Sequence, residues 1–372
     1  MNSVVMNADK SLLFIPDISG YTQFVQSTET EHSRHVIAEL LEVLIEANTQ
    51  ELALAEVEGD ALFFYKEGEI PSQEKLLAQI ETMFTAFYSH LKMLEKNRIC
   101  PCTACATAPK LRLKVVAHCG DLGFIEVQGN RKPFGSQVIE AHRLLKNSID
   151  SDNYALISND LAQNIGLPLH YCSKVFQFES GFDTYDGKNV DYMYALIERE
   201  NLTLSAYHQA KEVVLDRPPK LTTRKEFPVK ASVLFEYITN YTYRSYWVKG
   251  VDKFEYQENQ VTRAGTEHLC VINGKHLNII AVTREAAPGE LVYGEMTTSL
   301  LPFDVFYQFY TIKPVEDGKS MLVTETYWET KSILKKLLIA LVVKRAFTKN
   351  GTKSLTDLSN FIRQREGLNV ES

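Results

Sequence analysis

Two aspartates occupy positions from which their carboxylates could share metal ions. Asp17 ends an apolar run in FIPDISGYT, and Asp60 lies in the turn of EVEGDALFFY. Taken alone, an aspartate after a strand is most often a turn or helix-capping residue. Two carboxylates at neighbouring strand ends are more informative, because grouped titratable side chains are typical of metal and catalytic sites. The pair therefore favours a metal or nucleotide role over a structural one.

Three cysteines, Cys100, Cys102 and Cys105, crowd into the segment CPCTAC. Their thiolates could converge on one tetrahedral zinc ion, which needs a fourth ligand. His90, Cys119 or a residue of a partner chain could supply it. Because C-x-C-x-x-C without a second half is a weaker signature than paired C-x-x-C motifs, reduced loop cysteines or a labile disulfide are the alternatives.

The first 200 residues predict the elements that must position these side chains. Apolar residues alternate or run together in short stretches that predict strands, and between them they recur at helical spacing. The predicted order is strand, helix, hairpin, helix, strand pair, helix, with helices over 33–50, 72–94 and 136–148. This order is typical of an α+β sandwich whose helices lie on one side of an antiparallel sheet. His118, on a predicted strand, is expected to be a core residue.

The length of 372 residues predicts about two domains. Periodicity stops near residue 200, and a Pro-Pro pair follows, so we predict domains at 1–200 and 222–372 with a linker at 201–221. The second domain has hairpin-like strands and closes with a long helical segment over 332–365, with a predicted interruption near Gly351.

Composition narrows the classes of function. With 45% hydrophobic and 23% charged residues the chain reads as soluble and globular. A net charge of -7 argues against non-specific nucleic-acid binding, which needs a basic face. The longest apolar run, 337–343, is far too short to span a bilayer. Because the N-terminus also lacks the pattern of a secretory signal, we expect a cytoplasmic protein.

Four motifs in the first domain together resemble the class III nucleotidyl cyclases. They are FIPDISGYT, EVEGDALFFY, LKVVAHCGDLG and FGSQVIEAHRLL, in the family's order within about residues 10–198. The resemblance implies a ferredoxin-like α/β sandwich that converts a nucleoside triphosphate to a cyclic monophosphate and pyrophosphate. It also implies a homodimer, in which one chain supplies the metal ligands and the other the remaining catalytic groups.

The resemblance assigns roles to particular residues. Asp17 and Asp60 would hold two Mg²⁺ or Mn²⁺ ions, with the Ile18 carbonyl as a further oxygen ligand. The turn that opens the following helix would present backbone N–H groups to the phosphates. Its residues are Ser19, Gly20, Tyr21 and Thr22.

The base-reading and transition-state positions depart from the family pattern. Glu56 and Lys132 have a polarity that suits guanine, although the two could equally pair with each other and block the pocket. Arg143 matches the arginine that stabilises charge at the α-phosphate, and Lys188 loosely matches a lysine that contacts the terminal phosphates. Ile139 stands where the family has an asparagine, so the transition-state half of the site looks damaged.

The second domain resembles the START-like, helix-grip superfamily, which includes polyketide cyclases and lipid-transfer proteins. The similarity lies in the strand RKEFPVKAS, the helix LFEYITNYTYRSYW, the strands up to TETYWE and the long final helix. In that fold a curved sheet wraps the helix and leaves an apolar cavity for a hydrophobic small molecule. Six aromatics could line the cavity or form ordinary core: Trp247, Phe254, Tyr293, Phe306, Phe309 and Trp328.

Three functions remain open at this point. The first is a signalling protein whose cyclase-like domain is tuned by an apolar ligand in the second domain. The second is a nucleotide sensor or dimer scaffold that has lost turnover. The third is a lipid or small-molecule binder whose active part is the second domain.

Overall fold

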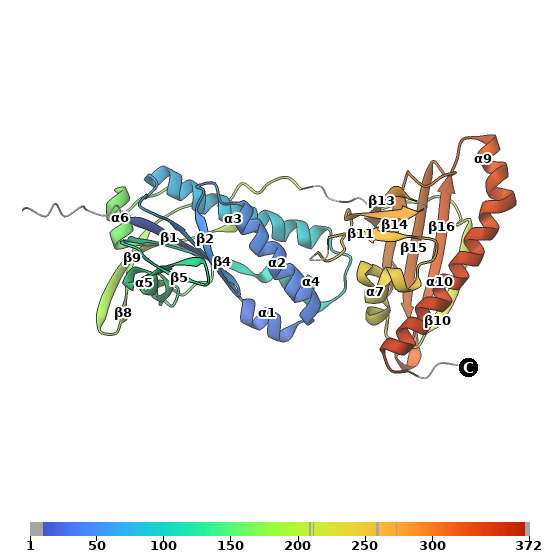
Figure 1. Cartoon of the computed structure of the whole chain (residues 1–372), viewed down its shortest axis with the longest axis horizontal. Coiled ribbons are helices and arrows are strands. Elements are labelled where there is room, and N and C mark those ends of the chain that lie inside the picture. The colour runs from blue at the N-terminus through green and yellow to red at the C-terminus, as the bar shows by residue number, and fades with distance from the viewer. Residues whose placement is uncertain (1–9, 208–209, 211, 258–259, 273, 369–372) are drawn as a thin grey trace, which may run out of the picture. The chain divides into compact units, whose positions relative to one another are not determined.

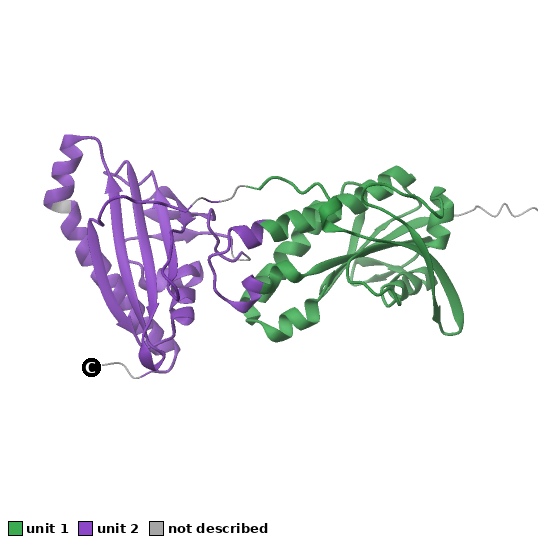
Figure 2. Ribbon diagram, turned by 180° about the vertical axis from the view of Figure 1, so that it is seen from behind, with its two compact units in different colours: residues 1–92, 107–207 green, residues 93–106, 208–372 purple. Residues whose placement is uncertain are grey.

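A computed structural model describes residues 10–207, 210, 212–257, 260–272 and 274–368 of the chain. Figure 2 shows its two compact units, one formed by residues 1–92 and 107–207 and the other by residues 93–106 and 208–372. Of the predicted linker, residues 208, 209 and 211 lie outside the described residues. So do residues 1–9 at the start of the first predicted domain and residues 369–372 at the end of the second. Both units mix helices and strands, so the chain is an α+β protein.

Among the described residues, the first unit forms a seven-stranded sheet. In chain order its strands are β1 (Ser11–Ser19), β2 (Ala53–Glu58), β3 (Ala61–Lys66), β4 (Arg112–Gly120), β7 (Tyr154–Ser158), β8 (Glu179–Tyr185) and β9 (Lys188–Leu196). Side by side they run β2-β3-β1-β4-β7-β9-β8, which places β1 and β4 in the interior of the sheet.

The pairing differs from the predicted antiparallel sheet at one place. β4 and β7 are parallel, because the chain between them passes through a separate hairpin and a helix before it returns to the sheet. That hairpin consists of β5 (Gly123–Val127) and β6 (Asn130–Phe134). The predicted strand pair of β4 with β5 is therefore not formed, and β4 pairs with β1 and β7 instead.

Helices cover both faces of this sheet, so the predicted arrangement with helices on one side only is wrong. On one face, Leu13 and Ile15 pack against Ala141 and Leu144 of α5 (Ser136–Leu144). The alternate residues of β1, such as Phe14, are equally buried and point to the opposite face. Figure 1 shows α2 (Thr30–Glu46) and α3 (Gln73–Lys96) side by side along the sheet. The shorter helices of this unit are α1 (Tyr21–Ser27), η1 (Ala108–Lys110), α6 (Asn159–Ile165) and η2 (Arg199–Asn201). α4 (Thr103–Thr107) lies almost entirely in the segment 93–106, which belongs to the second unit.

The second unit contains a seven-stranded sheet in which all the neighbouring strands among the described residues are antiparallel. Its order is β10-β16-β15-β14-β13-β12-β11, with the edges formed by β10 (Leu221–Phe227) and β11 (Lys253–Glu255). The inner strands are β12 (Glu267–Ile272), β13 (Lys275–Val282), β14 (Leu291–Thr297), β15 (Val305–Pro314) and β16 (Ser320–Glu329). Short helical turns fill the connections, namely α7 (Ala231–Thr239), η3 (Tyr241–Tyr243), α8 (Arg244–Trp247) and η4 (Glu316–Gly318).

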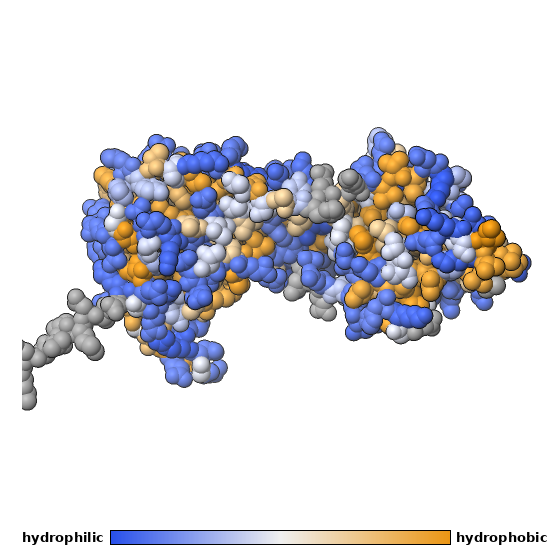
Figure 3. Space-filling model, turned by 90° about the horizontal axis from the view of Figure 1, so that it is seen from above, coloured by the Kyte–Doolittle hydropathy of each residue, from blue (hydrophilic) through white to orange (hydrophobic). Residues whose placement is uncertain are grey.

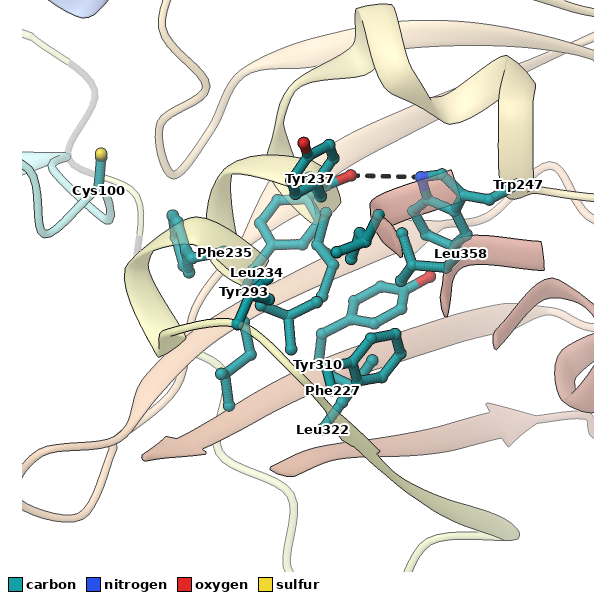
Figure 4. Packing of buried hydrophobic residues seen from close by; sticks show 14 of the residues in the cluster. Cys100, Phe227, Leu234, Phe235, Tyr237, Trp247, Tyr293, Tyr310, Leu322 and Leu358 are labelled. Atoms are coloured by element: carbon teal, nitrogen blue, oxygen red, sulfur yellow. Dashed lines mark hydrogen bonds between the residues drawn. The ribbon is translucent and has the colours of Figure 1, made fainter. Parts of the chain in front are cut away.

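The core of this unit lies between the sheet and the long helix α10 (Lys344–Arg365). Leu355, Leu358 and Ile362 of α10 belong to one buried cluster with side chains of the sheet and of α7. Figure 4 shows this packing, including the hydrogen bond of 3.2 Å that Trp247 Nε1 donates to the Tyr237 carbonyl. The long helix thus contributes an apolar face to the core, as amphipathic helices do.

The predicted helical segment is interrupted at a different place from Gly351. α9 (Ile333–Leu338) passes into a π-helical turn, η5 (Ile339–Val343), and then into α10. Gly351 lies inside α10, where the helix continues. Helix irregularities of this kind commonly arise where the hydrogen-bonding pattern changes by one residue, which no spacing of apolar residues reveals.

Candidate functional site

The sheet of the first unit brings Asp17 and Asp60 together. β1 runs antiparallel to β3, and Asp17 is the register partner of Ala61, the residue after Asp60. The backbone N–H of Ile18 donates a hydrogen bond of 3.0 Å to the carbonyl of Asp60. The two carboxylates therefore occupy the same end of adjacent strands.

The surroundings of the two carboxylates disfavour their negative charge. Burial, and secondly the charge of Asp60, raise the pKa of Asp17 from 3.8 to about 6. The pKa of Asp60 is raised as well, mainly by burial. A divalent cation would lower both pKa values, because it would bring positive charge next to the two half-buried carboxylates.

Lys114 is a member of this site that sequence reasoning missed. It is the register partner of Asp17 on β4, and its charge lowers the pKa of both aspartates. Its Nζ also lies 3.2 Å from a carboxylate oxygen of Asp152. The only signal in the sequence is a lysine inside the apolar strand LRLKVVAHCG. This ammonium group partly supplies the charge that metal ions would bring.

The turn after β1 does not use Asp17 as a helix cap. The N-cap of α1 is Gly20, at φ 86, and no side chain caps that helix. This left-handed conformation favours glycine. The neighbouring hydroxyl of Ser19 is buried and has no hydrogen-bond partner among the described residues. Asp17 is therefore not the capping residue of α1. The hydroxyl without a partner belongs to Ser19, two residues after Asp17.

The two residues expected to read the base are paired with each other. Lys132, on β6, donates a hydrogen bond of 3.0 Å to Glu56 on β2, and both side chains are about half exposed. Beside this pair, Arg131 forms two hydrogen bonds to Glu67, at 2.7 and 2.8 Å. A nucleotide base would have to displace the contact between Lys132 and Glu56.

The remaining predicted catalytic residues gather at another part of the sheet. Arg143, on α5, pairs with Asp186 in the turn between β8 and β9, and Lys188 lies 3.5 Å from Glu140 of the same helix. Among the described residues, no hydrogen bond or ion pair joins either cation to Asp17 or Asp60. β4 and β7 separate β1 from the edge that β9 and β8 form. Ile139 is exposed on α5, and the buried His118 bonds to Ser158 and Gln137 as a core residue.

The cysteine segment forms a compact group of ligand atoms. The sulfurs of Cys100, Cys102 and Cys105 lie within 4.8 Å of one another. The N–H groups of Cys102 and Cys105 point at the sulfurs of Cys100 and Cys102, at 3.5 and 3.3 Å. Hydrogen bonds to sulfur are typical second-sphere support for a thiolate that binds a metal.

The two residues of this chain that the sequence suggested as a fourth ligand have other surroundings. His90 is hydrogen-bonded to Glu39 at 3.1 Å, and Cys119 is buried on β4, where burial raises its pKa to about 11. All six cysteines are free in this structure. Contacts with the two neighbouring sulfurs raise the pKa of Cys100.

The second unit encloses a cavity of about 360 Å³ between the sheet and α10. Trp247, Phe254 and Phe306 line it. The other three predicted aromatics are absent from the wall that the described residues form. Phe309 points to the opposite face because strand residues alternate, Trp328 packs with Phe303 and Phe306, and the hydroxyl of Tyr293 bonds to Glu295 and Tyr241.

A buried ion pair in the wall of this cavity was not predicted. Arg244 donates a hydrogen bond of 2.7 Å to Glu295, and their side chains are 2% and 12% exposed. Four aromatic rings lie 5.0–5.5 Å from the guanidinium carbon, those of Tyr241, Trp247, Tyr293 and Tyr310. The sequence signals were an arginine within YTYRSYW and a glutamate within the strand LVYGEMT. The cavity therefore combines apolar side chains with hydroxyl and amide side chains and one buried, charge-balanced ion pair.

Comparison with known proteins gives partial matches. A family described as "Protein of unknown function (DUF2652)" matches residues 37–154. An uncharacterized protein of Mycobacterium tuberculosis is 32% identical over 127 residues, which are 34% of this chain and 59% of that protein. The chain thus spans a little over half the length of this relative.

Among solved structures, nucleotidyl cyclases are similar to about half of the chain. The adenylyl cyclase CyaB from P. aeruginosa has a TM-score of 0.38 at 16% identity, covering 52% of this chain and 97% of that one. The guanylate cyclase domain of RhGC from Catenaria anguillulae, solved with GTP, has a TM-score of 0.38 at 16% identity, covering 52% and 98%. The guanylyl cyclase Cya2 has a TM-score of 0.37 at 15% identity, covering 53% and 97%.

Proposed function

We propose that the first unit binds a nucleoside triphosphate through divalent ions held by Asp17 and Asp60, and converts it slowly to a cyclic monophosphate. The observation that carries this proposal is the pairing of two half-buried carboxylates with raised pKa values at adjacent strand ends. In this reaction the 3'-hydroxyl attacks the α-phosphate, and pyrophosphate leaves. The metal ions, Mg²⁺ or Mn²⁺, would activate the hydroxyl and offset the charge of the triphosphate.

The chain's own residues would position the nucleotide around those ions. The Ile18 carbonyl adds an oxygen ligand, and the turn over Ser19–Thr22 offers backbone N–H groups to the phosphates. Lys114 competes with the metal for Asp17, and Ile139 cannot hydrogen-bond the ribose. Because one missing donor can lower a rate by about 10²-fold, turnover is expected to be slow.

A second copy of the chain would complete the site, because Arg143 and Lys188 lie apart from the two aspartates. Exposed apolar side chains support such a homodimer. On the β5–β6 hairpin these are Ile125, Val127 and Phe134, and Ile139 follows them on α5. Apolar side chains gathered in this way on a soluble surface commonly mark a protein interface.

The second unit, on this proposal, binds an amphipathic small molecule and tunes the first unit. Its cavity has the size and the apolar lining of a ligand site, with the Arg244–Glu295 pair as the polar contact. A neutral head group with a hydroxyl or carbonyl suits this pair, because a net charge would be costly to bury there. Tuning requires that the ligand favour one dimer geometry over another.

The cysteine segment is proposed as a structural zinc site. Three sulfurs with a fourth protein ligand are a standard zinc donor set, and such a set leaves no open position for catalysis.

The nucleotide proposal is tested by incubating the purified protein with each nucleoside triphosphate and Mn²⁺ or Mg²⁺, and measuring cyclic product and pyrophosphate. Asp17→Ala and Asp60→Ala should abolish product, whereas Asp191→Ala, an exposed aspartate on β9, should not. Metal-dependent nucleotide binding without product would favour the sensor. Neither binding nor product would leave the second unit as the active part.

A further inference from the structure

The second unit exposes a group of large apolar side chains on and beside α9. Ile333, Leu334, Leu337, Leu338 and Leu341 are 49–80% exposed, and Leu301, in the loop before β15, is 71% exposed. Figure 3 shows apolar surface at the end of the second unit where α9 lies. We call these six residues the apolar patch. Scattered exposed leucines are ordinary, but a contiguous patch of this size marks an interaction surface.

The apolar patch is not exposed because the core beneath it is incompletely packed. The inner side of the same segment is already packed, since Ile339 is buried against Phe303, Phe306 and Trp328. The segment therefore has two apolar sides, one of which faces the protein and the other the solvent.

Cations border this patch, although the whole chain has a net charge of -7. Residues 330–356 contain seven lysines and arginines and no acidic residue. Lys335 pairs with Asp304, but the other six form no ion pair with the described residues, namely Lys331, Lys336, Lys344, Arg345, Lys349 and Lys353. Four of these, Lys344, Arg345, Lys349 and Lys353, line a surface hollow on α10 together with Thr348 and Thr352.

We infer that this segment docks the protein on an anionic lipid bilayer, with the apolar patch in the acyl boundary and the bordering cations against the head groups. An apolar helix face edged by lysine and arginine is the physical signature of a helix that lies in the membrane surface. None of the helices that the structure describes is long and apolar enough to cross a bilayer, so the segment would lie flat. A second copy of the chain is a poor occupant, because it would bring the same six unpaired cations.

The docking surface adjoins the cavity. Leu300, Phe306 and Phe347 line the cavity and also belong to the cluster that packs beneath η5. A bilayer at the apolar patch would therefore lie next to that end of the cavity, from which an amphipathic molecule could enter. This last step rests on the proposed ligand function of the second unit, whereas docking itself does not.

Docking is tested by co-sedimentation of the full chain with vesicles of phosphatidylcholine alone or with about 30% phosphatidylserine. We expect binding to the anionic vesicles only, and its loss in high salt, because surface charges are screened. Lys344→Ala with Arg345→Ala should weaken binding roughly 25-fold, at about five-fold for each cation. Leu334→Glu with Leu337→Glu should abolish it, and Val214→Glu, at an equally exposed apolar residue outside the patch, should not.

The readout involves neither nucleotide turnover nor cavity occupancy, so it can fail or succeed independently of the proposed function. Circular dichroism of each variant verifies that it remains folded. Absence of binding to anionic vesicles, equal binding to neutral ones, or undiminished binding of the folded Leu334→Glu, Leu337→Glu variant would each overturn the inference.

Discussion

The guanidinium of Arg244 and the carboxylate of Glu295 form a hydrogen-bonded ion pair at 2.7 Å in the wall of the cavity of the second unit. α8 supplies the arginine and β14 the glutamate. Removing two charges from water is costly, and their mutual attraction compensates only while both are present. The pair is therefore a weak source of stability but a sensitive point of the fold.

Arg244→Met should destabilise the second unit by about 3–5 kcal/mol, because it leaves Glu295 charged and buried. Arg244→Met with Glu295→Leu should recover much of that loss, since no unpaired charge remains. Urea unfolding measures both, with Arg224→Met on the exposed surface of β10 as control. Losses that simply add in the double variant would show that the two side chains are not coupled.

Asp17→Asn should stabilise the metal-free protein at neutral pH. The native state holds the proton of Asp17 up to a pKa of about 6, compared with 3.8 ordinarily, so stability from this group is full below pH 4 and is lost as the pH rises through 6. At about 1.4 kcal/mol for each pH unit, the variant gains up to about 3 kcal/mol at pH 7.5 and almost nothing at pH 3.5.

Thermal unfolding in EDTA at the two pH values measures this gain. Asp191→Asn is the matched control, because that side chain is exposed. A stabilisation of the same size at both pH values would show that titration of Asp17 is not its cause.

Lys114→Met should strengthen Mn²⁺ binding. The ammonium group of Lys114 lowers the pKa of both aspartates and so competes with a metal ion for the same negative charge. At pH 8, where both carboxylates are ionised, its removal should lower the Kd for Mn²⁺ several-fold. Electron paramagnetic resonance of free Mn²⁺ measures the change, with the exposed Lys174→Met as control. An unchanged or higher Kd would mean that Lys114 supports the metal rather than replacing it.

The residues that sequence reasoning found and missed differ in a physical way. Motif and alternation were sufficient to single out Asp17 and Asp60, because both depend on local strand and turn signals. Lys114, Arg244 and Glu295 matter only through partners on other elements, and such contacts are fixed by strand register and long-range packing that one sequence does not display. Phe309 shows the same limit. Like Phe306 it is an aromatic residue of β15, but the alternation of side chains along the strand places it on the other face of the sheet.

Cys102→Ser should remove zinc from the protein, because a structural site requires all of its ligands. The native chain, purified without chelators, should contain about one zinc ion, measured by inductively coupled plasma mass spectrometry. Cys172→Ser, at an exposed cysteine outside the segment, should keep that ion. A native chain that neither contains zinc nor takes it up on titration would show that the three thiols are simply reduced cysteines.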